Sequence, residues 1–168
     1  MRRSSAALGS AAFFILTPGT VAGALPLWIS GAQLPMPFHG YQAVQALGAI
    51  LIAGGVVSLA VSFVRFVREG RGTPAPIAPT ASLVVGGQYR HVRNPMYVAV
   101  LCIILGQALF FVSVGVLAYA ALVLAAVHTF VVLYEEPTLR ETYGAQYETY
   151  VRSVPRWIPR VTPWHPAP

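Results

Sequence analysis

The sequence predicts an all-α fold, a polytopic integral membrane protein with about four transmembrane helices and a cytoplasmic C-terminal helix. The composition, the length of the apolar runs and the distribution of charge support this prediction. Hydrophobic residues make up 56% of the 168 residues and charged residues only 10%, whereas a soluble domain carries about a quarter charged residues. A run of about 20 apolar residues is long enough to cross a bilayer as a helix, and the chain contains several such runs.

Four apolar segments are expected to cross the membrane, at about 6–29, 41–66, 97–114 and 116–134. A signal peptide is the alternative for the first segment, but the run is too long, and Pro18 and Pro26 are tolerated as kinks in membrane helices. The last two segments form one apolar run of about 35 residues, or about 52 Å of helix, which exceeds the roughly 30 Å of a bilayer core. We therefore expect a tight turn near Ser113 and Gly115, within one membrane domain that comprises residues 1–168.

The connecting segments have compositions typical of loops and of a terminal helix. Residues 30–40 are rich in turn-forming residues and carry no formal charge, and residues 71–80 form a proline-rich, extended connector. Residues 138–152 have the pattern of one helix, and a proline-rich tail follows. Within the second apolar segment, Gly54 and Ser58 have the small-xxx-small spacing that suits close contact between membrane helices.

All charged side chains fall on one side of the membrane that these segments predict. The charges precede the first segment, lie between the second and third, or follow the fourth, and the two opposite loops contain none. The positive-inside rule then places both termini and the middle loop in the cytoplasm. We expect a multi-pass protein of a bacterial inner (plasma) membrane. The net charge of +6 does not indicate a nucleic-acid partner, because the arginines flank apolar runs.

The sequence offers no metal-binding pattern. The four histidines, His39, His91, His128 and His165, are scattered, and the single cysteine, Cys102, lies within an apolar run. Zinc sites need closely spaced histidine or cysteine ligands. We therefore expect no metal ion and no disulfide.

Polar residues concentrate at two places that the predicted hairpin brings together. Arg90, His91 and Arg93 precede the third segment, and Glu135 and Glu136 follow the fourth. Arginines at the ends of membrane helices commonly extend to lipid headgroups, and this interpretation remains open from residue types alone. Two acidic residues, however, gain nothing from an anionic inner leaflet, and the Asn-Pro pair at 94–95 interrupts the backbone in a way that favours a pocket.

The order of short motifs from about residue 81 onward resembles the isoprenylcysteine carboxyl methyltransferase family. This superfamily of small membrane methyltransferases includes the phospholipid N-methyltransferases. The resemblance covers about half of the chain, and the first two apolar segments carry no motif of this kind. The motifs read GQY at 87–89, RNPMY at 93–97, EEPTL at 135–139, YGAQYETY at 143–150 and VPRWIP at 154–159.

The resemblance implies S-adenosylmethionine as cofactor, bound by motifs within residues 81–160. Arg93 or His91 is expected to bind its carboxylate, and Glu135 its ammonium group or ribose. A tyrosine ring, Tyr89 or Tyr97, would face the cationic methyl-sulfonium end. The complete set of expected cofactor-binding residues is Ala81, Ser82, Leu83, Val84, Tyr89, His91, Arg93, Asn94, Pro95, Met96, Tyr97 and Glu135.

The residues that would bind the methyl acceptor depart from the pattern of the family. Relatives that methylate prenylcysteine carry an arginine where this chain has Val131, so Arg152 and Arg156 are the candidates to replace it. We expect methyl transfer to a lipophilic small molecule or lipid in contact with membrane lipids. Glu136 and His128 are the candidate bases, and the pattern leaves O- or N-methylation and the oligomeric state undecided. The alternative is a non-enzymatic small membrane protein, an assembly factor or carrier with the same fold.

Overall fold

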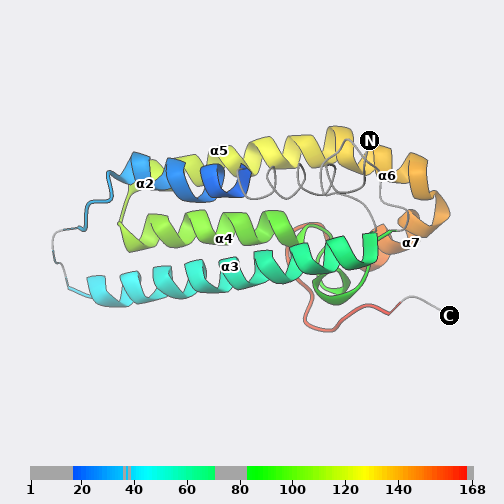
Figure 1. The fold of residues 1–168 in the computed structure, drawn as a ribbon, viewed down its shortest axis with the longest axis horizontal. Helices are drawn as coiled ribbons and strands as arrows, with labels where there is room; N and C mark the ends of the chain where they lie inside the picture. Colours follow the sequence, from blue (N-terminus) through cyan, green and yellow to red (C-terminus); the bar gives the residue numbers. More distant parts are fainter. Residues whose placement is uncertain (1–16, 36, 38, 71–82, 166–168) are drawn as a thin grey trace, which may run out of the picture.

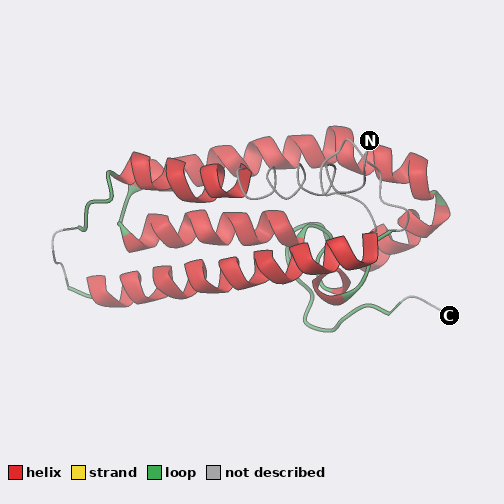
Figure 2. Cartoon of the chain, in the orientation of Figure 1, coloured by secondary structure: helices red, strands yellow, loops and turns green. Residues whose placement is uncertain are grey.

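The computed structural model describes residues 17–35, 37, 39–70 and 83–165, and within these ranges every regular element is a helix (Figure 2). The expected cofactor residues Ala81 and Ser82, the proline-rich connector and the first part of the first apolar segment lie outside the described residues. The elements in chain order are the π-helix η1 (Gly19–Ala24), α2 (Leu25–Ser30), α3 (Tyr41–Gly70), the 3₁₀ turn η2 (Gly87–Arg90), α4 (Pro95–Phe110), α5 (Val114–Phe130), the π-helix η3 (Val131–Glu135), α6 (Glu136–Tyr143) and α7 (Ala145–Ser153).

The helices form an elongated bundle in which α3, α4 and α5 run side by side (Figure 1). Helix α2 packs against α4 and α5 at one end, and η2, α6, α7 and the C-terminal tail gather at the other. The shared core contains Ile104 and Val116, both fully buried. All charged residues in the described part of the chain belong to the second end, which we call the charged end.

Helices α3 and α4 approach closely at two glycines spaced seven apart, Gly48 and Gly55. A Cβ atom on Gly48 would lie 2.6 Å from the carbonyl oxygen of Gly106 in α4, so only glycine fits there. Gly54, whose spacing with Ser58 suits a close contact between helices, makes no such contact among the described residues, since no atom lies within 4 Å of a Cβ position there. Seven residues span about two helical turns, so this spacing keeps one face of α3 toward α4.

A proline explains the π-helix that precedes α2. Pro26 has no N–H, so the carbonyls four and five residues before it, those of Ala22 and Val21, lack their usual helical donors. Side chains from neighbouring helices replace those donors: Gln107 Nε2 donates to the Ala22 carbonyl, and Tyr119 Oη donates to the Val21 carbonyl at 2.9 Å. In an apolar environment such freed carbonyls need a partner, so Gln107 and Tyr119 fix the first helical segment to α4 and α5.

The predicted turn between the third and fourth apolar segments lies at residues 111–113. Val112 takes a left-handed conformation (φ 48°), and Ser113 caps α5 by accepting the Val116 N–H at 3.3 Å. Helices α4 and α5 therefore run antiparallel and bring their far ends together at the charged end (Figure 1).

The single helix predicted over residues 138–152 is instead two helices. Gly144, with φ of 52°, separates α6 from α7, and its N–H closes the first helix on the Arg140 carbonyl. Glycine adopts this left-handed conformation at little cost. The break turns α7 back across the charged end, which a continuous helix would not do (Figure 1).

The apolar helices are consistent with a membrane protein. Two of them, Tyr41–Arg65 and Val114–Tyr143, are long and apolar enough to cross a bilayer, and the helices Gly19–Ser30 and Pro95–Phe110 are shorter. Their outward faces carry large apolar side chains, including Trp28 and Val114, each 80% exposed. Exposed apolar surface of this extent indicates contact with lipid. The four-span topology stays a prediction.

Candidate functional site

The ends of α4 and α5 meet at the charged end through Tyr97 and Glu135. The Tyr97 hydroxyl donates to Glu135 Oε2 at 3.2 Å, across 38 residues of sequence. Asn94 is the N-cap residue of α4 and Pro95 its first residue, so the Asn-Pro pair sets the point at which the helix begins. The proximity that the hairpin predicted for these two ends is confirmed.

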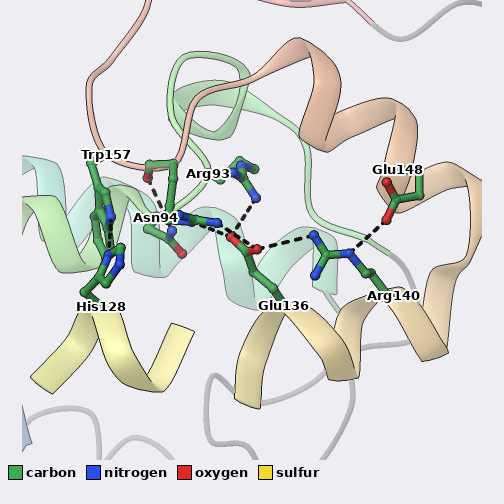
Figure 3. A network of polar contacts seen from close by, with 8 residues as sticks. Arg93, Asn94, His128, Glu136, Arg140, Glu148 and Trp157 are labelled. Carbon is green, nitrogen blue, oxygen red and sulfur yellow. Dashed lines mark hydrogen bonds and ion pairs between the residues drawn. The ribbon is translucent and has the colours of Figure 1, made fainter. Parts of the chain in front are cut away.

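Glu136 is the centre of a buried ion cluster (Figure 3). Its Oε1 atom accepts from Arg93 Nη1 at 2.8 Å and from Arg156 Nε at 2.6 Å, and its Oε2 atom accepts from Arg156 Nη2 at 3.0 Å. Arg140 Nη2 lies 3.5 Å from the same Oε2 atom and its Nε donates to Glu148 at 2.9 Å. We call these five residues, Arg93, Glu136, Arg140, Glu148 and Arg156, the Glu136 ion cluster.

The cluster joins segments that are distant in the sequence. Arg93 precedes α4, Glu136 and Arg140 lie in α6, and Arg156 follows α7. The Glu136 carboxylate raises the pKa of the Arg156 guanidinium, because the ion pair stabilises the charged form. With three guanidinium groups around it, the Glu136 side chain is only 4% exposed and carries a compensated charge.

The tail after α7 lies against the loop that leads into α4. Backbone N–H groups of this pair of segments donate from Arg93 to Pro155 O (2.9 Å), from Arg160 to His91 O (2.9 Å) and from Trp164 to Arg90 O (3.0 Å). His91 Nδ1 also donates to the Arg160 carbonyl at 2.8 Å, and Asn94 Nδ2 to that of Arg156 at 3.3 Å. The expected binding residues His91 and Asn94 are therefore already engaged in holding the tail.

The tail also reaches α5 through Trp157. The indole Nε1–H donates to His128 Nδ1 at 3.1 Å (Figure 3), and the two rings lie 6.0 Å apart between centroids. The Nδ1 atom of His128 thus carries the lone pair and not the proton. His128 is otherwise exposed on the surface of α5.

The other residues that the sequence singled out have different surroundings. Val131 is 1% exposed, and Arg152 is exposed on α7. The expected cofactor residues Val84, Tyr89 and Pro95 are buried, whereas Leu83 and Met96 are partly buried. The Tyr150 hydroxyl donates to the Tyr89 carbonyl at 2.7 Å, and burial raises the pKa of Tyr150. The hydroxyl of Tyr150 therefore stays protonated as a donor.

Sequence reasoning missed Arg140, Glu148 and Trp157. Arg140 lies four residues after Glu136, and this spacing is a recognisable ion-pair signal on a helix. Glu148 meets Arg140 only because the chain reverses at Gly144, and Trp157 meets His128 only because the tail folds back. Neither contact leaves a periodic signal in the sequence.

An all-helical, apolar bundle with one charged end defines the protein as membrane-associated. The family model for phospholipid methyltransferases matches residues 43–146, which is more than half of the chain. The chain therefore belongs to the phospholipid methyltransferase family, and membership implies a methyltransferase that acts on lipid-like substrates. Comparisons with curated proteins and with solved structures found no match.

The residues at the charged end fit the cofactor that this family generally uses, S-adenosylmethionine. The Nε atoms of Arg90 and Arg93 are buried and have no hydrogen-bond partner among the described residues. A buried N–H without a partner is costly, and an anionic ligand group would satisfy it. Glu135 offers a carboxylate that accepts a hydrogen bond from the Tyr97 hydroxyl. The site thus combines cationic donors with an anionic acceptor, as a zwitterionic ligand requires.

Proposed function

We propose that this protein transfers a methyl group from S-adenosylmethionine to a lipid-like acceptor at the cytoplasmic surface of the membrane. The observation that carries the proposal is the contact between Tyr97 and Glu135, which unites the RNPMY and EEPTL motifs in one site. Family membership supports the reaction class. The placement of all described charges at one end supports a site that a water-soluble cofactor reaches from the cytoplasm.

The side chains can be given separate roles toward the cofactor. The Nε–H groups of Arg90 and Arg93, which have no partner in the part of the chain that the structure describes, bind the carboxylate in preference to His91, whose Nδ1 is engaged with Arg160 O. Glu135 binds the ammonium group or the ribose, and Tyr97 orients the Glu135 carboxylate. The apolar side chains of Leu83, Val84, Pro95 and Met96, with Tyr89, are assigned to the adenine and the methyl-bearing end.

Methyl transfer to a nucleophile is an in-line displacement, so the protein contributes mainly by orientation and by excluding water. S-adenosylmethionine supplies an electrophilic methyl group. The carboxylate of Glu136 is held by three guanidinium groups, which stabilise its charged form and make it a poor proton acceptor. We therefore assign Glu136 to holding the site together, and His128 remains the candidate base for an acceptor that must lose a proton.

The surroundings of the acceptor side favour a neutral or amine-bearing lipid head. Val131 provides no positive charge, and Arg156 is committed to Glu136 by two hydrogen bonds. Arg152 is exposed on α7. An acidic acceptor head would therefore be left without a cation, which costs several kcal/mol at a poorly hydrated site.

A labelling experiment tests this function. Membranes that contain the protein are incubated with isotopically labelled S-adenosylmethionine, and the extracted lipids are examined for label. We expect labelled lipid from the wild-type protein and strongly reduced labelling from Glu135→Gln, with Glu141→Gln as the matched control on the exposed face of α6. Equal labelling by wild-type membranes and by membranes that lack the protein would contradict the proposal.

A further inference from the structure

A polar contact joins α3, which carries no recognised motif, to the turn η2, which contains the GQY motif at residues 87–89. The side-chain oxygen of Gln88, in the turn η2, accepts hydrogen bonds from two serines of α3: Ser58 Oγ at 3.2 Å, and Ser62 Oγ. The serines are four residues apart, so both lie on one face of α3. Ser62 is 1% exposed and lies seven residues after Gly55, on the same face of α3.

The neighbouring residue confirms how closely η2 lies against α3. Gly87 has φ of 54°, and a Cβ atom there would overlap the side chain of Arg65 in α3. Glycine is favoured at position 87 by its left-handed backbone conformation, and its lack of a side chain leaves room for the flexible Arg65 side chain. The turn η2 therefore packs against α3 at Gly87 as well as at the Gln88 side chain.

The backbone of Gln88 is hydrogen-bonded to the segment that directly precedes the expected cofactor-binding residues Arg93 and Asn94. Its carbonyl accepts the N–H groups of His91 (2.9 Å) and Val92 (3.1 Å), which directly precede Arg93 and Asn94. On the other side of the turn, the Tyr89 carbonyl accepts from Tyr150. The turn is therefore held between α3 and α7, and the side chain of Gln88 sets its distance from α3.

We propose that Gln88, through Ser58 and Ser62, is a positioning residue that determines the affinity of the site for S-adenosylmethionine. This inference rests on the function proposed above. Gln88 does not touch the reacting atoms; it fixes the start of the segment that presents Arg93 and Tyr97 toward Glu135. The second apolar helix, which carries no recognisable motif, thereby contributes to the site.

The chain offers a matched control, Gln45, at the opposite end of α3. Gln45 in α3 donates from its Nε2 atom to the Phe110 carbonyl at the end of α4, at 3.1 Å. Gln45→Leu removes one partly buried side-chain hydrogen bond that involves α3, and Gln88→Leu removes two. A purely structural role predicts losses of thermal stability and unchanged cofactor affinity for both variants.

The experiment measures the dissociation constant of S-adenosylhomocysteine, the demethylated cofactor, by calorimetry on the full-length protein in detergent. We expect Gln88→Leu to raise the dissociation constant about tenfold, which corresponds to about 1.4 kcal/mol of binding free energy, because the segment before Arg93 is no longer held in its binding position, and Gln45→Leu to leave it unchanged. Ser58→Ala gives a smaller increase and Ser58→Thr, which keeps the hydroxyl, restores the wild-type value. Ser58→Ala also reports on the contact if Gln88→Leu does not fold.

The outcomes separate this inference from the function on which it rests. If the wild-type protein does not bind the cofactor product, the proposed function is wrong. If the wild type binds and both Gln88→Leu and Ser58→Ala bind as tightly, the positioning role is wrong and the function stands. If Ser58→Ala weakens binding and Ser58→Thr does not restore it, the hydroxyl is not responsible and the role is likewise overturned.

Discussion

Arg156 forms a bidentate ion pair with Glu136, with Nε 2.6 Å from Oε1 and Nη2 3.0 Å from Oε2. The two residues are 20 positions apart in the sequence. This pair ties the tail to the start of α6, while Arg93 ties the same carboxylate to the segment that leads into α4. One buried acid thus connects the segments that carry the candidate site. Its removal would leave Arg93, whose side chain is only 9% exposed, without a counter-charge.

The first prediction concerns stability. Glu136→Gln should lower the free energy of unfolding by about 3 kcal/mol, because breaking a buried ion pair leaves an uncompensated charge. Glu148→Gln removes an exposed partner of Arg140 and should cost less than about 1 kcal/mol. Denaturation of both variants in the same detergent measures the difference. Equal losses would show that the Glu136 ion cluster does not stabilise the charged end.

The second prediction concerns the contact between α3 and α4. Gly48→Ala should destabilise the protein by about 1–3 kcal/mol, because the added methyl group meets the Gly106 backbone. Gly54→Ala is the matched control: nothing lies within 4 Å of its Cβ position, and alanine should raise the free energy of unfolding by up to about 1 kcal/mol. Thermal unfolding of both variants checks this. If Gly54→Ala were the more harmful change, the observed helix register would be wrong.

The sequence predicted those features that follow from length and patterning. An apolar run too long for one crossing implied a hairpin, and the hairpin implied that Tyr97 and Glu135 lie close together, which the structure confirms. Family membership, inferred from motif order, is confirmed as well. Both inferences depend on local spacing, which a single sequence displays directly.

Other features depend on contacts between irregular segments and could not be predicted. The hydrogen bond from the Arg160 N–H to the His91 carbonyl joins two segments without periodicity. Neither segment has a sequence pattern that indicates which other segment it contacts. Gly144 within a helical pattern is ambiguous, because an isolated glycine is tolerated in a helix or ends it. The sequence could not show that Gly48 and Gly55, and not Gly54, contact α4, because this depends on how α3 is rotated about its own axis.

The third prediction concerns the acceptor. We expect low or absent methyl transfer to farnesyl- or geranylgeranyl-cysteine analogues and better transfer to an amine-bearing or neutral lipid, because no arginine stands at Val131. Purified protein with labelled cofactor and each acceptor provides the comparison. Efficient transfer to a prenylcysteine analogue that disappears in Arg152→Ala or Arg156→Ala would show instead that the tail supplies the missing cation.

The fourth prediction concerns topology. With Cys102 replaced by serine, a cysteine at Gln33, in the loop between α2 and α3, should react with a membrane-impermeant thiol reagent added from outside. A cysteine at Gln146, exposed on α7 close to Gly144, should react only after the membrane is opened. The expectation follows from the positive-inside rule. The reverse labelling pattern would place the charged end outside and remove its access to a cytoplasmic cofactor.

The most direct test of the central claim is a calorimetric titration of S-adenosylmethionine or S-adenosylhomocysteine into the purified protein, with Glu135→Gln and Glu141→Gln alongside. We predict that the wild-type protein binds, that Glu135→Gln binds roughly ten- to a hundredfold more weakly, as the loss of a charge-assisted hydrogen bond implies, and that Glu141→Gln matches the wild type. Absence of binding by the folded wild-type protein, or an unchanged dissociation constant in Glu135→Gln, would contradict a cofactor site between Tyr97 and Glu135.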